Sequence, residues 1–162
     1  MTTLFADGGH NTLTGKVAWG RVVNTKSEDQ LAEFSELFPD LVIENQKLPV
    51  GYQRSMKDSY VVVADFKDVS KQQNNGAELL ALLCALRIAM FDDTIILINS
   101  DSELLTKWWS VSGPNKITAK KMDQQKLAYI QEVRSLRLRF EKRGGKITKI
   151  SGDDNLADLG FH

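Results

Sequence analysis

Residues 73–89 read QNNGAELLALLCALRIA, an almost wholly apolar stretch with one carboxylate, Glu78, near its start. The apolar residues leave no polar stripe, which predicts a helix over Ala77–Met90 that is buried on all sides. Asn75, followed three residues later by Glu78, matches a capping box, in which each side chain satisfies a free amide at the helix start. Capping and metal binding both use a carboxylate. The segment alone favours a capping role for Glu78 and does not decide whether Glu78 binds a metal ion.

Strand-like runs precede this helix and alternate with helices after it. Three runs before it predict an antiparallel meander whose first strand stops at Asp7-Gly8-Gly9. They are Thr3–Ala6, Lys16–Val23 and Tyr60–Phe66. Those after it are strand Thr94–Asn99, helix Ser102–Ser110, helix Asp123–Arg143 ending at Gly144-Gly145, strand Lys146–Ile150 and a turn after Gly152. This order predicts one α/β domain over residues 1–162, with a five-stranded mixed sheet flanked by helices. Because helices connect them, the fourth and fifth strands are predicted to run parallel to the first.

An insert of about thirty residues, 27–57, separates the second and third predicted strands. Its amphipathic piece Asp29–Phe38 is stopped by Pro39, which predicts a short helix followed by an irregular loop. Either a partner-binding or a stabilising role is open for this insert.

Composition predicts a soluble protein in a reducing compartment. The chain is 42% hydrophobic and 26% charged, and no apolar run approaches the roughly 18 residues of a membrane span. The first residues, MTTLFADGG, lack the features of a signal peptide, and the single Cys84 has no partner for an internal disulfide. We therefore expect a cytoplasmic protein in which Cys84 packs in the core.

Charge is unevenly distributed although the net charge is zero. Residues 27–106 carry 14 acidic and 6 basic side chains, whereas residues 107–149 carry 12 basic and 3 acidic ones. A basic segment in a neutral domain favours polyanion binding, because Lys and Arg release counterions from a phosphate backbone. A solvated helix face is the alternative, and Arg134, Arg137 and Arg139 fit it.

Three carboxylates lie where predicted elements meet: Asp7 after the first strand, Glu78 at the helix start and Asp101 after TIILINS. In a sheet with parallel strands, ligands bind beyond the carboxyl ends at a switch point in strand order. If the first and fourth strands are neighbours, the two aspartates lie side by side with Glu78 above them. Clustered carboxylates resist ionising unless a cation is shared. Oxygen ligands without a nearby His or Cys pair indicate Mg²⁺ or Mn²⁺.

Four pieces of the chain, in this order, resemble type 1 ribonuclease H. They are LFADGG (residues 4–9), NNGAELLALLCAL (74–86), LINSDSELL (97–105) and DNLAD (154–158). The resemblance implies a ribonuclease H-like fold and a monomer that hydrolyses the RNA strand of RNA–DNA hybrids, leaving 5′-phosphate and 3′-hydroxyl ends. It implies four catalytic metal ligands, Asp7, Glu78, Asp101 and Asp158. Two divalent ions would hold the scissile phosphate, one activating water and the other stabilising the leaving oxygen.

The resemblance also implies substrate contacts. The implied residues are Gly8, Gly9, His10, Asn11, Asn74, Asn75, Ser102, Lys107, Trp108, Lys116, Lys120 and Lys121. Many family members grip the DNA strand with a basic helix-loop protrusion, and the lysines of 107–121 occupy that region in a shorter form. Trp108 and Trp109 are predicted to pack under this loop rather than stack on bases.

The end of the chain departs from the family pattern. Asp154 stands where the family has Asn, and its catalytic His is absent, since Gly152 runs directly into Asp153. A contribution of Asp153, Asp154 or His162 to the site is therefore open. Two other functions are compatible: a structure-selective DNA nuclease such as a junction resolvase or integrase-like enzyme, and a binding module without catalysis.

Overall fold

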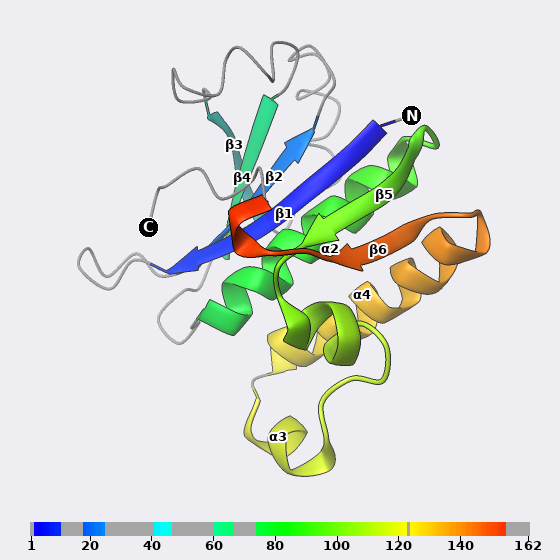
Figure 1. Ribbon diagram of the computed structural model, residues 1–162. Helices are drawn as coiled ribbons and strands as arrows, with labels where there is room; N and C mark the ends of the chain where they lie inside the picture. The colour runs from blue at the N-terminus through cyan, green and yellow to red at the C-terminus, as the bar shows by residue number, and fades with distance from the viewer. Residues whose placement is uncertain are drawn as a thin grey trace.

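The computed structural model describes residues 2–10, 18–24, 41–46, 60–66, 74–122 and 124–154. Six strands form one sheet in the order β3-β4-β2-β1-β5-β6 (Figure 1). The strands are β1 (Thr2–His10), β2 (Ala18–Asn24), β3 (Leu41–Gln46), β4 (Tyr60–Phe66), β5 (Ile95–Ser100) and β6 (Lys146–Lys149). The helical segments are α2 (Asn74–Phe91), η3 (Leu104–Trp109), α3 (Lys116–Lys121), α4 (Gln124–Lys142) and η4 (Gly152–Asp154).

The sheet is mixed, and β1 lies where strand direction changes. β1 pairs antiparallel with β2, which pairs antiparallel with β4. On its other side β1 pairs in parallel with β5, and β5 in parallel with β6. The strands β1, β5 and β6 therefore run in one direction, as predicted from the helical connections between them.

The prediction of five strands is wrong, because the insert at 27–57 contributes an additional one. The strand β3 lies within it and pairs antiparallel with β4, as in the register pair Ile43↔Ala64. The run LVIENQ contains only three consecutive apolar residues. Such a short pattern identifies a strand weakly until a partner edge is available. The helix predicted at Asp29–Phe38 lies outside the described residues.

The helix α2 forms the centre of the hydrophobic core. Every residue from Leu79 to Leu86 has an exposed fraction of 0%, including Cys84. The helix packs on β1 and β2, and α4 packs beside it through Ile130 and Val133 (Figure 1). Because α2 is enclosed by the sheet and by α4, its sequence needs no polar face. Among the described helices, none is both long enough and apolar enough to cross a membrane.

The helix α4 ends as predicted at the two glycines. Gly144 has a φ of 97°, a left-handed conformation that glycine adopts without a Cβ clash. The Gly145 amide donates to the Phe140 carbonyl at 2.9 Å. A Cβ on Gly145 would lie 2.5 Å from the Phe140 ring, so the buried ring leaves room only for glycine.

The segment after β5 differs from the predicted regular helix. The described η3 is a π-helical turn in which the Ser110 amide donates to the Leu105 carbonyl at 3.1 Å, five residues earlier. The short helix α3 follows, and the sequence pattern missed it because its side chains form no buried stripe. Its start is fixed by Asn115, whose Oδ1 accepts the Thr118 amide at 2.8 Å.

Candidate metal centre

Strand pairing places Asp7 and Asp101 side by side. The last parallel pair between β1 and β5 is Ala6↔Ser100, and an aspartate is the next residue on each strand. The prediction that the first strand stops at Asp7 is wrong, because β1 continues to His10 through its pairing with β2. Asp7 instead lies where the parallel ladder ends and the antiparallel one continues. This is a switch point, as expected for a ligand site.

Hydrogen bonds fix the turn that carries Asp101. The Ser102 amide donates to the Ser100 hydroxyl at 3.2 Å, and the Leu105 amide donates to the Ser102 hydroxyl at 3.3 Å. From the neighbouring chain segment, the Ile150 amide donates to the Ser100 carbonyl at 2.9 Å. The Ser102 hydroxyl, predicted to contact substrate, thus stabilises the start of η3 in this structure.

Glu78 projects from α2 toward β1. The helix begins at Asn74, one residue before the predicted cap residue Asn75. The Glu78 carboxylate is hydrogen-bonded to the Gly8 backbone and to the Asp7 side chain. It therefore interacts with β1, while the capping box with Asn75 stays a prediction, because the side chain of Asn75 is not described.

The three carboxylates form one buried cluster. Asp7, Glu78 and Asp101 each offer a carboxylate oxygen, and these atoms all lie within 4.8 Å of one another. The exposed fractions of Asp7 and Glu78 are 3% and 9%, while Asp101 is half-buried. Burial, and then the negative charges of Asp7 and Asp101, raise the pKa of Glu78 to about 9, against an ordinary value of 4.5. The folded chain thus holds a carboxylate whose ionisation at neutral pH requires a compensating charge.

The residues present fit a divalent cation. The ligand atoms are all hard oxygens, which suit Mg²⁺ and Mn²⁺ better than Zn²⁺. Among the described atoms, Glu78 Oε2 is buried and has no hydrogen-bond partner. A cation at this position would satisfy that oxygen and permit ionisation of the cluster. The three carboxylates are therefore a candidate metal centre.

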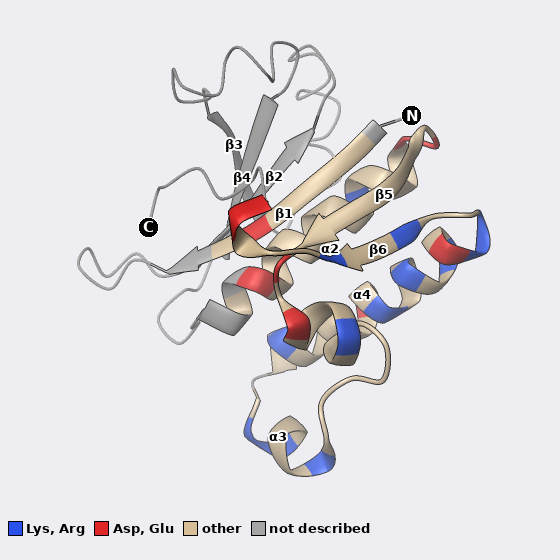
Figure 2. Ribbon diagram, viewed as in Figure 1, with Lys and Arg blue, Asp and Glu red and all other residues tan. Residues whose placement is uncertain are grey.

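The end of the described chain passes close to this centre. A Cβ on Gly152 would lie 3.3 Å from Asp101 Oδ2, so η4 begins in contact distance of the cluster. Figure 2 shows the acidic segments of β1, α2, the loop after β5 and η4 in one part of the molecule. Asp153 and Asp154 are exposed on η4. Asp158, the predicted fourth ligand, lies outside the described residues. Sequence reasoning missed Gly152, although a glycine preceding two aspartates was the available signal.

Several predicted substrate contacts are described only through their backbone. Gly9 and His10 extend β1, and Asn74 and Asn75 open α2, but their side chains are not described. Asn11 and His162 lie outside the described residues. Gly8 is buried, and its backbone contacts Glu78.

The predicted basic contacts lie together on the segment from η3 to α3. Lys107, Lys116, Lys120 and Lys121 are all exposed there. The prediction for the tryptophans holds for Trp109, with an exposed fraction of 7%, and is wrong for Trp108, which is 58% exposed. Because neighbouring residues of a helical turn point in different directions, Trp109 packs in the core while Trp108 does not.

Arg137 supports this segment from α4. Its guanidinium donates to the Thr106 carbonyl and to the Ser110 hydroxyl, the latter at 2.6 Å. The Glu141 carboxylate holds the same guanidinium at 2.5 Å. Its assignment to a solvated face is therefore wrong, because only 16% of the side chain is exposed. A π-helical turn leaves backbone carbonyls without their usual amide donors, and the Arg137 guanidinium supplies a donor to the Thr106 carbonyl.

Comparisons with known proteins give a weak structural likeness. No family model matches the chain, and no curated protein matches it. Among solved structures, the chain is similar to RNase H1 from the halophilic archaeon Halobacterium salinarum NRC-1. The two are 18% identical, the similarity covers 96% of this chain and 89% of that one, and the TM-score is 0.43. A likeness at this level assigns no role to any residue of this chain.

Proposed function

We propose that this protein is a metal-dependent nuclease that hydrolyses the RNA strand of RNA–DNA hybrids, leaving 5′-phosphate and 3′-hydroxyl ends. The observation that supports it is the convergence of Asp7, Glu78 and Asp101 from three separate elements within 4.8 Å. These are the three carboxylates that the sequence resemblance assigns to the ribonuclease H metal site.

The three carboxylates would hold the cations, with Asp158 as the proposed fourth ligand of a two-ion site. A bound Mg²⁺ or Mn²⁺ supplies Lewis-acid chemistry, polarising the phosphodiester and lowering the pKa of water. The protein holds the carboxylate ligands in position. The Gly8 backbone and the Ser100–Ser102 turn hold Glu78 and Asp101 before any ligand arrives. Such preorganisation avoids rearrangement during the reaction.

The basic segment is proposed to hold the nucleic acid near this centre. Residues 104–122 contain four lysines and no acidic residue, and Figure 2 shows basic positions on η3, α3 and α4. Lysines facing a phosphate backbone gain affinity through counterion release. Selectivity for RNA would require contacts to the 2′-hydroxyl, which we assign to residues 8–11 and to Asn74 and Asn75 at the start of α2.

Cleavage by the purified chain tests the proposal. Labelled RNA–DNA hybrid, duplex DNA and a four-way DNA junction are incubated with Mg²⁺ or Mn²⁺, and the product ends are identified. We expect hybrid cleavage that is lost in Asp101→Asn and retained in the matched control Asp93→Asn, whose side chain is 94% exposed and pairs with Arg143.

Each other outcome has a defined meaning. Preferential cleavage of the junction or of duplex DNA would support the DNA nuclease instead. Hybrid binding that is sensitive to salt, indifferent to metal and unaccompanied by cleavage would indicate a binding module. If Asp101→Asn cleaves as fast as the unaltered protein, the activity does not come from this centre and the proposal fails.

A further inference from the structure

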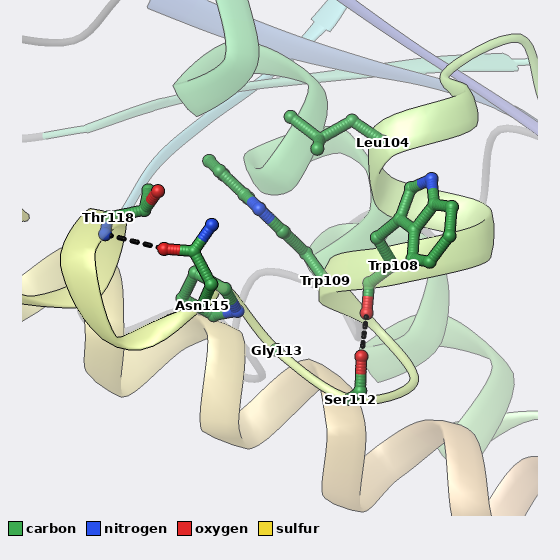
Figure 3. A pocket seen from close by; sticks show the side chains of 8 residues that line it. Leu104, Trp108, Trp109, Ser112, Gly113, Asn115 and Thr118 are labelled. Carbon is green, nitrogen blue, oxygen red and sulfur yellow. Dashed lines mark hydrogen bonds between the residues drawn. The ribbon is translucent and has the colours of Figure 1, made fainter.

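A pocket lies beside the tryptophans of η3, separate from the three carboxylates. Its volume is about 790 Å³, within the range of roughly 300–1,000 Å³ typical of ligand pockets. It is lined by Leu104, Trp108, Trp109, Ser112, Gly113, Pro114, Asn115 and Thr118. Figure 3 shows the two indoles on different sides of the hollow, with Leu104 on a third. The pocket therefore offers flat aromatic walls.

The exposure of its aromatic wall is not explained by packing. Trp108 is 58% exposed, and Val111 and Ile117, which follow it in sequence, are 54% and 72% exposed. Three of the exposed large apolar side chains among the described residues thus lie within ten positions of the chain. Grouped apolar exposure of this kind marks a binding surface more often than scattered single residues do.

The pocket wall is held in one conformation by hydrogen bonds. The backbone amides of Val111, Ser112 and Gly113 all point at the Trp108 carbonyl, at 3.1, 2.9 and 3.1 Å. The Arg134 side chain donates to the Val111 carbonyl at 3.2 Å. Gly113 completes the turn with a φ of 79°, which favours glycine. A wall ordered in advance lowers the entropy lost when a ligand binds.

Polar groups lie at the edge of the pocket. Asn115 uses its Oδ1 to accept the Thr118 amide at 2.8 Å, which leaves its Nδ2 hydrogens for a ligand acceptor. The Ser112 hydroxyl donates to the Trp108 carbonyl at 3.5 Å and keeps its lone pairs for a ligand donor. A flat ring with acceptors and donors on its edge matches this arrangement, and nucleobases have that chemistry.

The charge around the pocket selects an anionic occupant. Lys107 is partly neutralised by Glu103, 3.1 Å away. Lys116, Lys120 and Lys121 lie on the same short helix as the lining residue Thr118 and are exposed. A base alone carries no phosphate, whereas a nucleotide in a strand does, so these lysines favour a nucleic-acid strand over a neutral aromatic compound.

We propose that this pocket binds an unpaired nucleobase of a single-stranded segment of nucleic acid, stacked on Trp108. The inference goes beyond hybrid cleavage, because a base in a duplex is already stacked and cannot enter the pocket. Leu104 follows Asp101 by three residues, so their Cα atoms lie at most about 11 Å apart. A strand leaving the metal centre can therefore reach the pocket.

Binding measurements without divalent metal test the proposal independently of catalysis. The full chain in EDTA is titrated with a blunt RNA–DNA hybrid, with the same hybrid carrying a thymidine extension on its DNA strand, and with free oligothymidylate. We expect oligothymidylate to quench tryptophan fluorescence in the unaltered protein and not in Trp108→Ala. Trp108→Ala should lower affinity for the extended hybrid about tenfold and for the blunt one less than about twofold.

Matched variants separate stacking from general stickiness and from charge. Trp108→Phe keeps an aromatic face and should restore most of the affinity, whereas Leu138→Ala removes an exposed apolar group of α4 that does not line the pocket and should have no effect. Equal losses on both hybrids, or equal effects of Trp108→Ala and Leu138→Ala, would overturn the proposal. Binding to phosphatidylserine vesicles through Trp108, with no response to oligothymidylate, would also overturn it in favour of a membrane surface.

Discussion

The acidic centre and the basic aromatic segment are built in opposite ways. The centre combines Asp7 from within β1, Glu78 from α2 and Asp101 from the turn after β5, and it buries the first two. The basic aromatic segment, residues 104–122, is one continuous piece of chain whose lysines and Trp108 are exposed. Because folding forces the carboxylates together, their repulsion opposes stability. The lysines remain in solvent and cost the fold little. Changes at the centre should therefore alter both activity and stability, whereas changes on the segment should alter mainly binding.

The largest expected effect is on the rate of hybrid cleavage. Glu78→Gln keeps the shape of the side chain and removes its charge. We expect the rate to fall about a thousandfold, because charge stabilisation by a metal is worth several kcal/mol in the transition state. Single-turnover cleavage with saturating enzyme measures it, with Asp93→Asn as the control. A loss of less than about tenfold would remove Glu78 from the proposed centre.

The next effect separates the two tryptophans within the basic aromatic segment. Trp109→Ala should lower the free energy of unfolding by about 3–5 kcal/mol, since it leaves a cavity in the core. Trp108→Ala should change it by less than about 1 kcal/mol, because the side chain is 58% exposed. Urea denaturation followed by circular dichroism gives both values. Similar losses in the two variants would contradict the described positions of the indoles.

The pH dependence of stability probes the repulsion in the centre. In EDTA, Glu78 has a pKa of about 9 in the folded chain and 4.5 as its ordinary value. Between these values the folded chain retains a proton that the unfolded chain has lost. The stabilisation that comes from the higher pKa of Glu78 in the folded chain is therefore complete below pH 4.5 and is lost as the pH rises toward 9. Over this range the free energy of unfolding falls by up to about 1.4 kcal/mol per pH unit.

Denaturation at pH 6 and pH 8 measures this effect. The unaltered protein should lose up to about 2.7 kcal/mol of unfolding free energy over that interval, and Glu78→Gln should lose much less. Mg²⁺ should stabilise the unaltered protein more at pH 8 than at pH 6, because cation binding competes with the proton. Identical pH slopes for the two proteins would mean that Glu78 is not the titrating group.

The smallest expected effect concerns the approach of η4 to the centre. In Gly152→Ala the new methyl carbon would lie 3.3 Å from Asp101 Oδ2, so the carboxylate must shift slightly. We expect cleavage to fall about threefold to tenfold, because small displacements of a catalytic group are costly. Unfolding free energy should change by less than about 1 kcal/mol. Full activity in this variant would show that η4 does not constrain Asp101.

Local sequence patterns predicted the helices and strands whose secondary structure is determined by their own residues. The helix α2 and the strands β4 and β5 appear close to their predicted bounds, because long apolar or β-branched runs leave few alternatives. The strand β3 and the helix α3 were not predicted. The strand β3 depends on pairing with the edge of β4, and the helix α3 depends on the cap from Asn115. The π-helical turn η3 is contacted by Arg137, 27 residues after Ser110, and local patterns do not show such a contact.

The same division applies to the candidate site. Residue order and spacing were sufficient to nominate Asp7, Glu78 and Asp101, because ligands gather where strands end and helices begin. Their convergence within 4.8 Å, the contact of Glu78 with β1, and the exposure of Trp108 beside a buried Trp109 emerged only in the folded chain. Distances between residues remote in sequence are set by strand register and packing, and these are collective properties of many side chains.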